Sequence, residues 1–83
     1  MDDKIIENRP YRHFKGKLYF VHAVTENTET GELFVSYQAM YPPYNMYMRS
    51  LKAFTESVSV DRCDNVTKQS KRFILYDGKM KLY

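Results

Sequence analysis

Two alternating stretches decide the fold, LYFVHAV at residues 18–24 and LFVSYQAMY at residues 33–41. Successive side chains of a β-strand point to opposite faces of a sheet, so each stretch predicts a strand. One face of the first carries Leu18, Phe20, His22 and Val24, and one face of the second carries Leu33, Val35, Tyr37, Ala39 and Tyr41. The polar connection between them closes on Thr30-Gly31, where glycine allows the positive φ of a turn.

The rest of the chain adds short strands around a single helical turn. Pro42-Pro43 ends the second strand, because proline cannot donate to a sheet ladder. We expect short strands at residues 46–49 and 57–60, and a helical turn at residues 51–56 that begins at the N-cap Ser50. Asp77-Gly78 is typical of a two-residue hairpin turn and joins predicted strands at residues 72–76 and 79–83. This pattern predicts an all-β barrel or roll with a C-terminal β-hairpin.

The 83 residues are enough for one domain. We expect a polar arm at residues 1–10 and a single domain at residues 11–83. The lone Cys63 excludes an internal disulfide. No apolar run is long enough to span a membrane, and charged residues interrupt any apolar start that a secretion signal would need. We therefore expect a soluble, cytoplasmic protein with no membrane partner.

The net charge of +3 is concentrated at the C-terminal end. Residues 66–83 carry five basic side chains and only one acidic one, Asp77. Such asymmetry indicates an anionic partner. The commoner explanation is that lysine protects a solvated edge strand, and both interpretations stay open.

Catalytic and metal-binding patterns are missing from the sequence. His13, His22 and Cys63 have no recognisable metal-ligand spacing. The carboxylates at positions 26, 29 and 32 lie in a polar connection, whereas a general acid needs a desolvated pocket. The three glycines are too scattered for a phosphate-binding loop. We expect no enzyme activity, no cofactor and no metal.

The stretch YRHFKG at residues 11–16 packs aromatic and cationic side chains in front of a strand. Phe14 is expected to anchor it in the core, which leaves its neighbours exposed. Tyr47 and Arg49 alternate with methionines and therefore share a face. Rings together with Arg and Lys suit base stacking and phosphate contact, and they also form protein hot spots or simply cap a barrel end. The candidate ligand-binding residues are Tyr11, Arg12, His13, Lys15, Tyr47 and Arg49.

Three methionines flank the proline pair, at positions 40, 46 and 48. Flexible thioether side chains can line an adaptable groove. More often they fill an irregular core, and we expect that role for Met40, Met46 and Met48.

The order of these motifs resembles a family of small bacterial and phage proteins, domain of unknown function 1653. The resemblance rests on residues 11–16, Tyr19-x-Val21, the turn at residues 28–31 and Tyr47-x-Arg49, and covers roughly residues 11–60. It implies an SH3-like β-roll of unassigned activity. The family pattern usually has Trp at the position of Tyr47 and Pro at the position of Ser50, and the strand after Tyr76 is an addition to it.

These observations predict a non-catalytic binding module for an anionic or aromatic ligand, with nucleic acid or a nucleotide as the leading class. In this hypothesis the ligand's ring stacks on or hydrogen-bonds to Tyr11, His13 and Tyr47. Its phosphate group binds Arg12, Lys15 and Arg49. The alternative is a protein-interaction module with no small-molecule ligand. Met80 and Leu82 lie on the apolar face of the added strand, where they either cover a barrel end or form a homodimer interface, which we favour.

Overall fold

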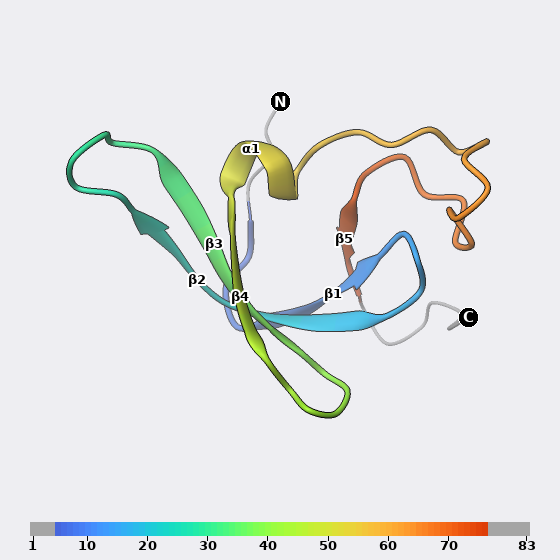
Figure 1. Cartoon of the computed structure of the whole chain (residues 1–83), viewed down its shortest axis with the longest axis horizontal. Coiled ribbons are helices and arrows are strands. Elements are labelled where there is room, and N and C mark those ends of the chain that lie inside the picture. The colour runs from blue at the N-terminus through green and yellow to red at the C-terminus, as the bar shows by residue number, and fades with distance from the viewer. Residues whose placement is uncertain (1–4, 77–83) are drawn as a thin grey trace.

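The computed structural model describes residues 5–76, which form five strands and one short helix (Figure 1). In chain order they are β1 (Arg9–His13), β2 (Leu18–Glu26), β3 (Leu33–Ala39), β4 (Met46–Ser50), α1 (Leu51–Phe54) and β5 (Phe73–Leu75). The predicted all-β class with one helical turn is confirmed.

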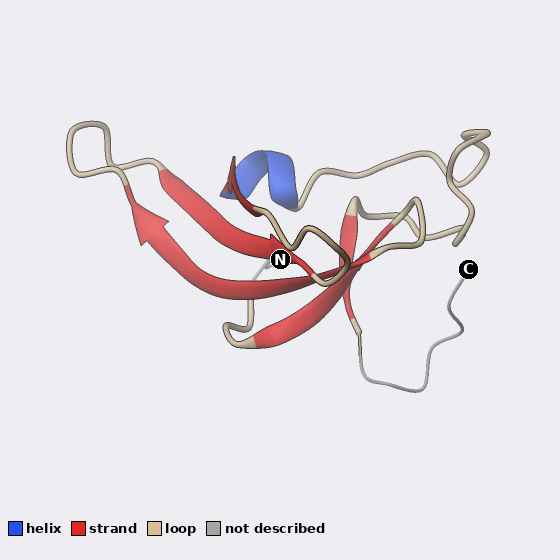
Figure 2. Ribbon diagram, turned by 60° about the horizontal axis from the view of Figure 1, so that its bottom comes forward, coloured by secondary structure: helices blue, strands red, loops and turns tan. Residues whose placement is uncertain are grey.

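The strands form one antiparallel sheet in the order β4-β3-β2-β1-β5, so among the described residues β4 and β5 are its edges. In a flat sheet these edges would lie about 19 Å apart, because neighbouring strands are spaced about 4.8 Å apart. Side chains from both edges nevertheless line one small pocket. The sheet is therefore strongly curled, and the curl is visible in Figure 2. The SH3-like roll implied by the resemblance stays a prediction.

The inner face of this curled sheet carries the core. Phe54 of α1 is fully buried and its ring stacks on Phe73 of β5, with centroids 4.1 Å apart. The helix is held over the core by its predicted N-cap, where Ser50 Oγ accepts a hydrogen bond from the Ala53 N–H at 3.1 Å. Phe14 is also buried, as expected. The core cluster is made of Tyr11, Val21, Val35, Tyr37, Phe54 and Phe73.

A β-bulge in β2 changes which side chains face inward. Val21 pairs with Tyr37, but Ala23 pairs with Ser36, so one extra residue lies between them on β2. Beyond the bulge, Val24 packs against the core, whereas simple alternation predicted that it shares a face with Leu18. That prediction is wrong because a bulge shifts the alternation by one residue.

Two further strand predictions need correction. Residues 9–13, expected to be partly arm and partly a closing segment, form a full strand between β2 and β5. Residues 57–60 form no strand; only Ser57 makes a single bridge, with Lys71. The connection there is held instead by buried side-chain amides, and Asn65 Nδ2 donates to the carbonyl oxygens of Ser59 and Gln69 at 2.8 Å each.

The C-terminal hairpin turn at Asp77-Gly78, the strand predicted at residues 79–83 and the interface residues Met80 and Leu82 lie outside the described residues. The strand predicted at residues 72–76 is present as β5. Within residues 5–76, no helix has the length and apolar character needed to cross a membrane.

Candidate functional site

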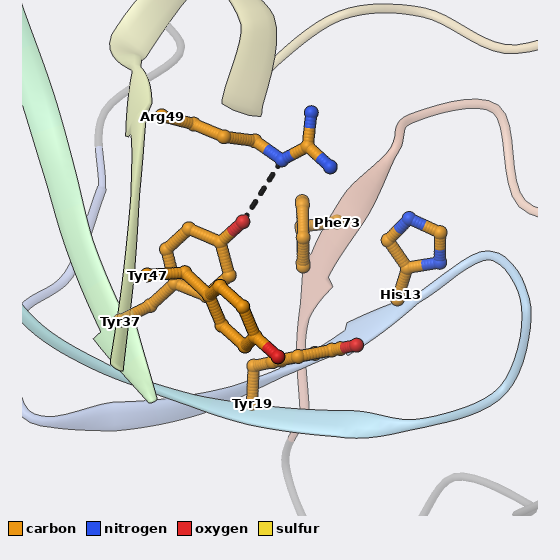
Figure 3. A pocket seen from close by; sticks show the side chains of 6 residues that line it. All are labelled: His13, Tyr19, Tyr37, Tyr47, Arg49 and Phe73. Atoms are coloured by element: carbon orange, nitrogen blue, oxygen red, sulfur yellow. Dashed lines mark hydrogen bonds between the residues drawn. The ribbon is translucent and has the colours of Figure 1, made fainter. Parts of the chain in front are cut away.

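A pocket of about 150 Å³ opens on the inner face of the sheet (Figure 3). All five strands contribute to it, and β4 contributes twice. Of the predicted site residues, the structure brings together His13, Tyr47 and Arg49. The lining residues are His13, Tyr19, Tyr37, Tyr47, Arg49 and Phe73.

Strand register places the rings of this pocket. His13 is the direct partner of Phe73 across β1 and β5, and Tyr37 is the direct partner of Tyr47 across β3 and β4. Residues that are paired in this way share a face of the sheet. Tyr19 joins the two pairs, because its ring makes edge contacts with all four of these rings at centroid distances of 5.5 to 6.4 Å.

The rings differ in how much solvent they meet. Tyr37 and Phe73 are 4% and 5% exposed, so they form the floor of the pocket and belong to the core as well. Tyr47 is 43% exposed and forms a wall. A flat ring with an open face is a surface on which a planar ligand can stack.

Arg49 gives the pocket its charge. Its Nε donates to the Tyr37 hydroxyl at 2.9 Å, which orients the guanidinium beside the rings (Figure 3). Within residues 5–76 its terminal nitrogens have no hydrogen bond and no ion pair. No Asp or Glu lines the pocket. The permanent positive charge is therefore left uncompensated by the walls of the pocket.

His13 is neutral at physiological pH. Its pKa is lowered to about 4 by burial, and then by the positive charges of Arg72, Arg49, Lys15 and Arg62. Its Nδ1 accepts the backbone N–H of Lys15 at 3.1 Å. Because that nitrogen is the acceptor, the proton of the neutral ring lies on Nε2, which becomes a donor.

Tyr19 keeps its proton as well. Its hydroxyl is hydrogen-bonded to the hydroxyl of Tyr41. Burial and this hydrogen bond raise the pKa of Tyr19 above its usual value. The polar atoms of the pocket thus offer mainly hydrogen-bond donors.

The remaining predicted site residues lie elsewhere. Tyr11 and Arg12 were expected to be exposed, but they are only 4% and 6% exposed. The Tyr11 hydroxyl accepts the Ile6 N–H at 2.9 Å, and its ring packs against Phe54 in the core. Arg12 points to the other face of β1, where its Nε approaches Gln69 Oε1 at 3.4 Å. The expectation failed because residues 9–13 form an interior strand between β2 and β5, where Tyr11 and Arg12 are each buried, on opposite faces.

Lys15 is exposed, as expected, but it lies outside the pocket lining. Its Nζ is 3.8 Å from an Asp64 carboxylate oxygen and 6.0 Å from the centre of the Phe14 ring. It acts on the pocket only through its charge beside His13.

Three lining residues were not predicted, namely Tyr19, Tyr37 and Phe73. A signal for two of them was present, since alternation from Val35 puts Tyr37 on the inner face and the recognised hairpin puts Phe73 there. Tyr19 belongs to the motif Tyr19-x-Val21, but nothing local in the sequence identifies it as the ring that joins the others.

The methionines do not fill the core. Met40, Met46 and Met48 are 45%, 57% and 64% exposed, so that prediction is wrong. Because Tyr47 and Arg49 face the pocket, alternation sends Met46 and Met48 to the opposite face of the edge strand β4. No described segment covers them there, since they remain mostly open to solvent.

Comparison with known proteins adds one finding. A family model described as "Protein of unknown function (DUF1653)" matches residues 9–75. The chain belongs to the DUF1653 family. The match includes every residue that lines the pocket, so the pocket lies within the DUF1653 domain. No curated protein and no solved structure matches the chain.

Proposed function

We propose that this DUF1653 domain is a non-catalytic binding module for an anionic ligand that carries an aromatic ring, namely a nucleotide or a nucleic acid. The observation that carries the proposal is the Arg49 guanidinium, which has unpaired terminal nitrogens beside a cage of five rings and no lining carboxylate. The rings would hold a base, and the guanidinium would donate to an acceptor oxygen of the ligand.

The charge of Arg49 argues against the other common use of aromatic cages. Such cages bind ammonium and methylated lysine groups through the negative faces of their rings. A guanidinium among the rings would repel a cationic ligand, and an acidic side chain that could offset it is missing from the lining set. An anionic ligand with an aromatic ring could stack on the rings and also pair with the charge of Arg49.

The lining residues also give little support for a reaction. Covalent catalysis needs a nucleophile beside a base that activates it. The lining set includes no serine, cysteine or carboxylate beside His13. Burial and a hydrogen bond keep the Tyr19 hydroxyl protonated. We therefore propose binding rather than catalysis.

The proposal is tested by fluorescence anisotropy of a short labelled oligonucleotide of mixed sequence. Arg49→Gln should weaken binding by about 1–3 kcal/mol, the size of a charge-assisted hydrogen bond. Arg9→Gln is the matched control, because Arg9 is exposed on β1 and does not line the pocket. The wild-type affinity should fall steeply between about 50 and 200 mM salt. If Arg49→Gln and Arg9→Gln bind the oligonucleotide equally well, the pocket is not the binding site and the proposal is wrong.

A second candidate is a protein-interaction module, and the exposed methionines favour it. Met40, Met46 and Met48 present flexible apolar side chains to solvent, and Met46 and Met48 do so on the face of β4 opposite the pocket. Met-rich surfaces adapt to protein partners. Binding that is lost in Met48→Lys, retained in Arg49→Gln and nearly independent of salt would establish this candidate instead. The proposed homodimer through Met80 and Leu82 belongs to the same class.

A further inference from the structure

We infer that the pocket receives a single pyrimidine base of an unpaired nucleotide, with the carbonyl edge of uracil or thymine as the best match to its hydrogen-bond donors. The inference rests on the proposed function and adds the identity of the base. It follows from the size of the pocket, the arrangement of its rings and the chemistry of its polar atoms.

The size of the pocket sets the first limit. Its volume is about 150 Å³. An engineered cavity of about 150 Å³ in another protein admits one benzene molecule. A six-membered pyrimidine ring therefore fits. The pocket is open to solvent on one side, so the attached sugar and phosphate can stay outside it.

The rings define how the base would lie. Tyr47 is 43% exposed, whereas Tyr37 and Phe73 are nearly fully buried. The ring of Tyr47 is therefore available for stacking. Tyr37 and Phe73 close the bottom, and His13 lies on the far side of Tyr19 (Figure 3). A base that enters along the face of Tyr47 would end on the floor, with its edge toward Arg49.

The polar atoms match the edge of a pyrimidine. The terminal nitrogens of Arg49 and the Nε2–H of His13 are donors, and neither has a hydrogen-bond partner within residues 5–76. Uracil and thymine present carbonyl oxygens as acceptors on both sides of the ring. A donor-lined pocket suits these oxygens. The positive charge of Arg49, the cation among the lining residues, would also attract the attached phosphate.

The same geometry excludes a base within a duplex. A paired base has both faces stacked and its edge hydrogen-bonded, so it cannot reach the rings and donors of this pocket without leaving the helix. The ligand is either a free pyrimidine nucleotide or one base of a single strand. Both present the same base and phosphate, and the experiment separates them.

The test uses the full chain and labelled hexamers of uridine and of adenosine at low salt, followed by fluorescence anisotropy. We expect the uridine hexamer to bind about tenfold or more tightly than the adenosine hexamer, because uracil presents acceptor oxygens to the donors of the pocket, whereas the amino group of adenine is itself a donor. Unlabelled UMP is then added as a competitor. Competition by UMP alone at a similar concentration identifies the free nucleotide as the ligand, and competition only by the hexamer identifies the single strand.

The variants place the base in the pocket. Tyr47→Ala should weaken uridine binding by about tenfold or more, because it removes the stacking wall. Tyr47→Trp should retain binding, and its indole gives a fluorescence signal without background because the chain has no other Trp. Met48→Ala is the control on the same strand, since Met48 is exposed on the opposite face.

The outcomes separate the two proposals. Equal affinity for uridine and adenosine hexamers, or uridine binding that is unchanged in Tyr47→Ala, would overturn the pyrimidine inference and leave the proposed function standing. Absence of binding to every oligonucleotide and nucleotide would overturn the proposed function itself.

Discussion

Replacing Phe54 tests whether the four-residue helix α1 really covers the core. Phe54 is fully buried, stacks on Phe73 at 4.1 Å and makes edge contacts with Tyr37 and Tyr11 at 5.4 and 5.7 Å. Truncating a buried Phe to Ala costs about 3–5 kcal/mol, which includes the cavity left behind. Aromatic pairs contribute a further ~0.5–1.5 kcal/mol each, so we expect Phe54→Ala to lie at the upper end of that range.

This loss is large for so small a domain. At about 0.05–0.15 kcal/mol per residue, a chain of this length has a free energy of unfolding of only about 4–12 kcal/mol. Phe54→Ala should therefore be partly unfolded at room temperature. Phe54→Leu fills most of the volume and should cost about half as much, which keeps the protein folded and measurable.

The assay is urea denaturation followed by circular dichroism. Met48→Ala is the control, because Met48 is 64% exposed, and it should change the free energy of unfolding by less than about 0.5 kcal/mol. A cooperatively folded Phe54→Ala with an unchanged melting temperature would show that α1 does not cover the core, and the reasoning would fail.

Three further predictions concern charge, pH and assembly. Arg12→Ala should lower the free energy of unfolding by about 1–3 kcal/mol, because Arg12 is buried beside Gln69; a melting temperature equal to that of wild type would refute this role. The pKa of His13 is about 4 in the folded protein and near 6.5 in the unfolded chain, so the unfolded state takes up the proton first and stability should fall as the pH drops from about 6.5 toward 4. After a discount for solvent exposure the loss is about 1–2 kcal/mol, and it should be absent in His13→Gln when urea midpoints at neutral and acidic pH are compared. Finally, sedimentation of the full chain should show a dimer that is lost on truncation after Tyr76; a full-length monomer at high concentration would rule out the hairpin interface.

The alternation of apolar and polar residues along the chain predicted much of the fold and part of the candidate site. It predicted β2, β3 and β4, and it put Tyr47 and Arg49 on one face. Alternation does not predict which face of β4 points inward. One face of this strand carries methionines and the other carries a tyrosine and an arginine, so neither face is clearly the more apolar one. The choice is made by the curl of the sheet, which turns Tyr47 toward Tyr37 and leaves Met46 and Met48 outside.

Long-range contacts account for the predictions that failed. Arg12 and Gln69 are 57 positions apart, so no local pattern reveals that the connection before β5 covers this side chain. The same connection replaces the strand expected at residues 57–60. Its hydrogen bonds come from buried amides such as Asn65 rather than from a sheet ladder, and a short polar sequence does not distinguish these two solutions.

The pocket and the core share their central residues. Tyr37 and Phe73 form the floor of the pocket and at the same time pack against Phe54. The floor is therefore as rigid as the core, and a ligand would meet a site that is already formed. The residues that meet solvent, Tyr47 and Arg49, lie on the edge strand, where a substitution disturbs few core contacts. Substitutions at Tyr47 and Arg49 should therefore change the surface of the pocket more than they change the packing of the core.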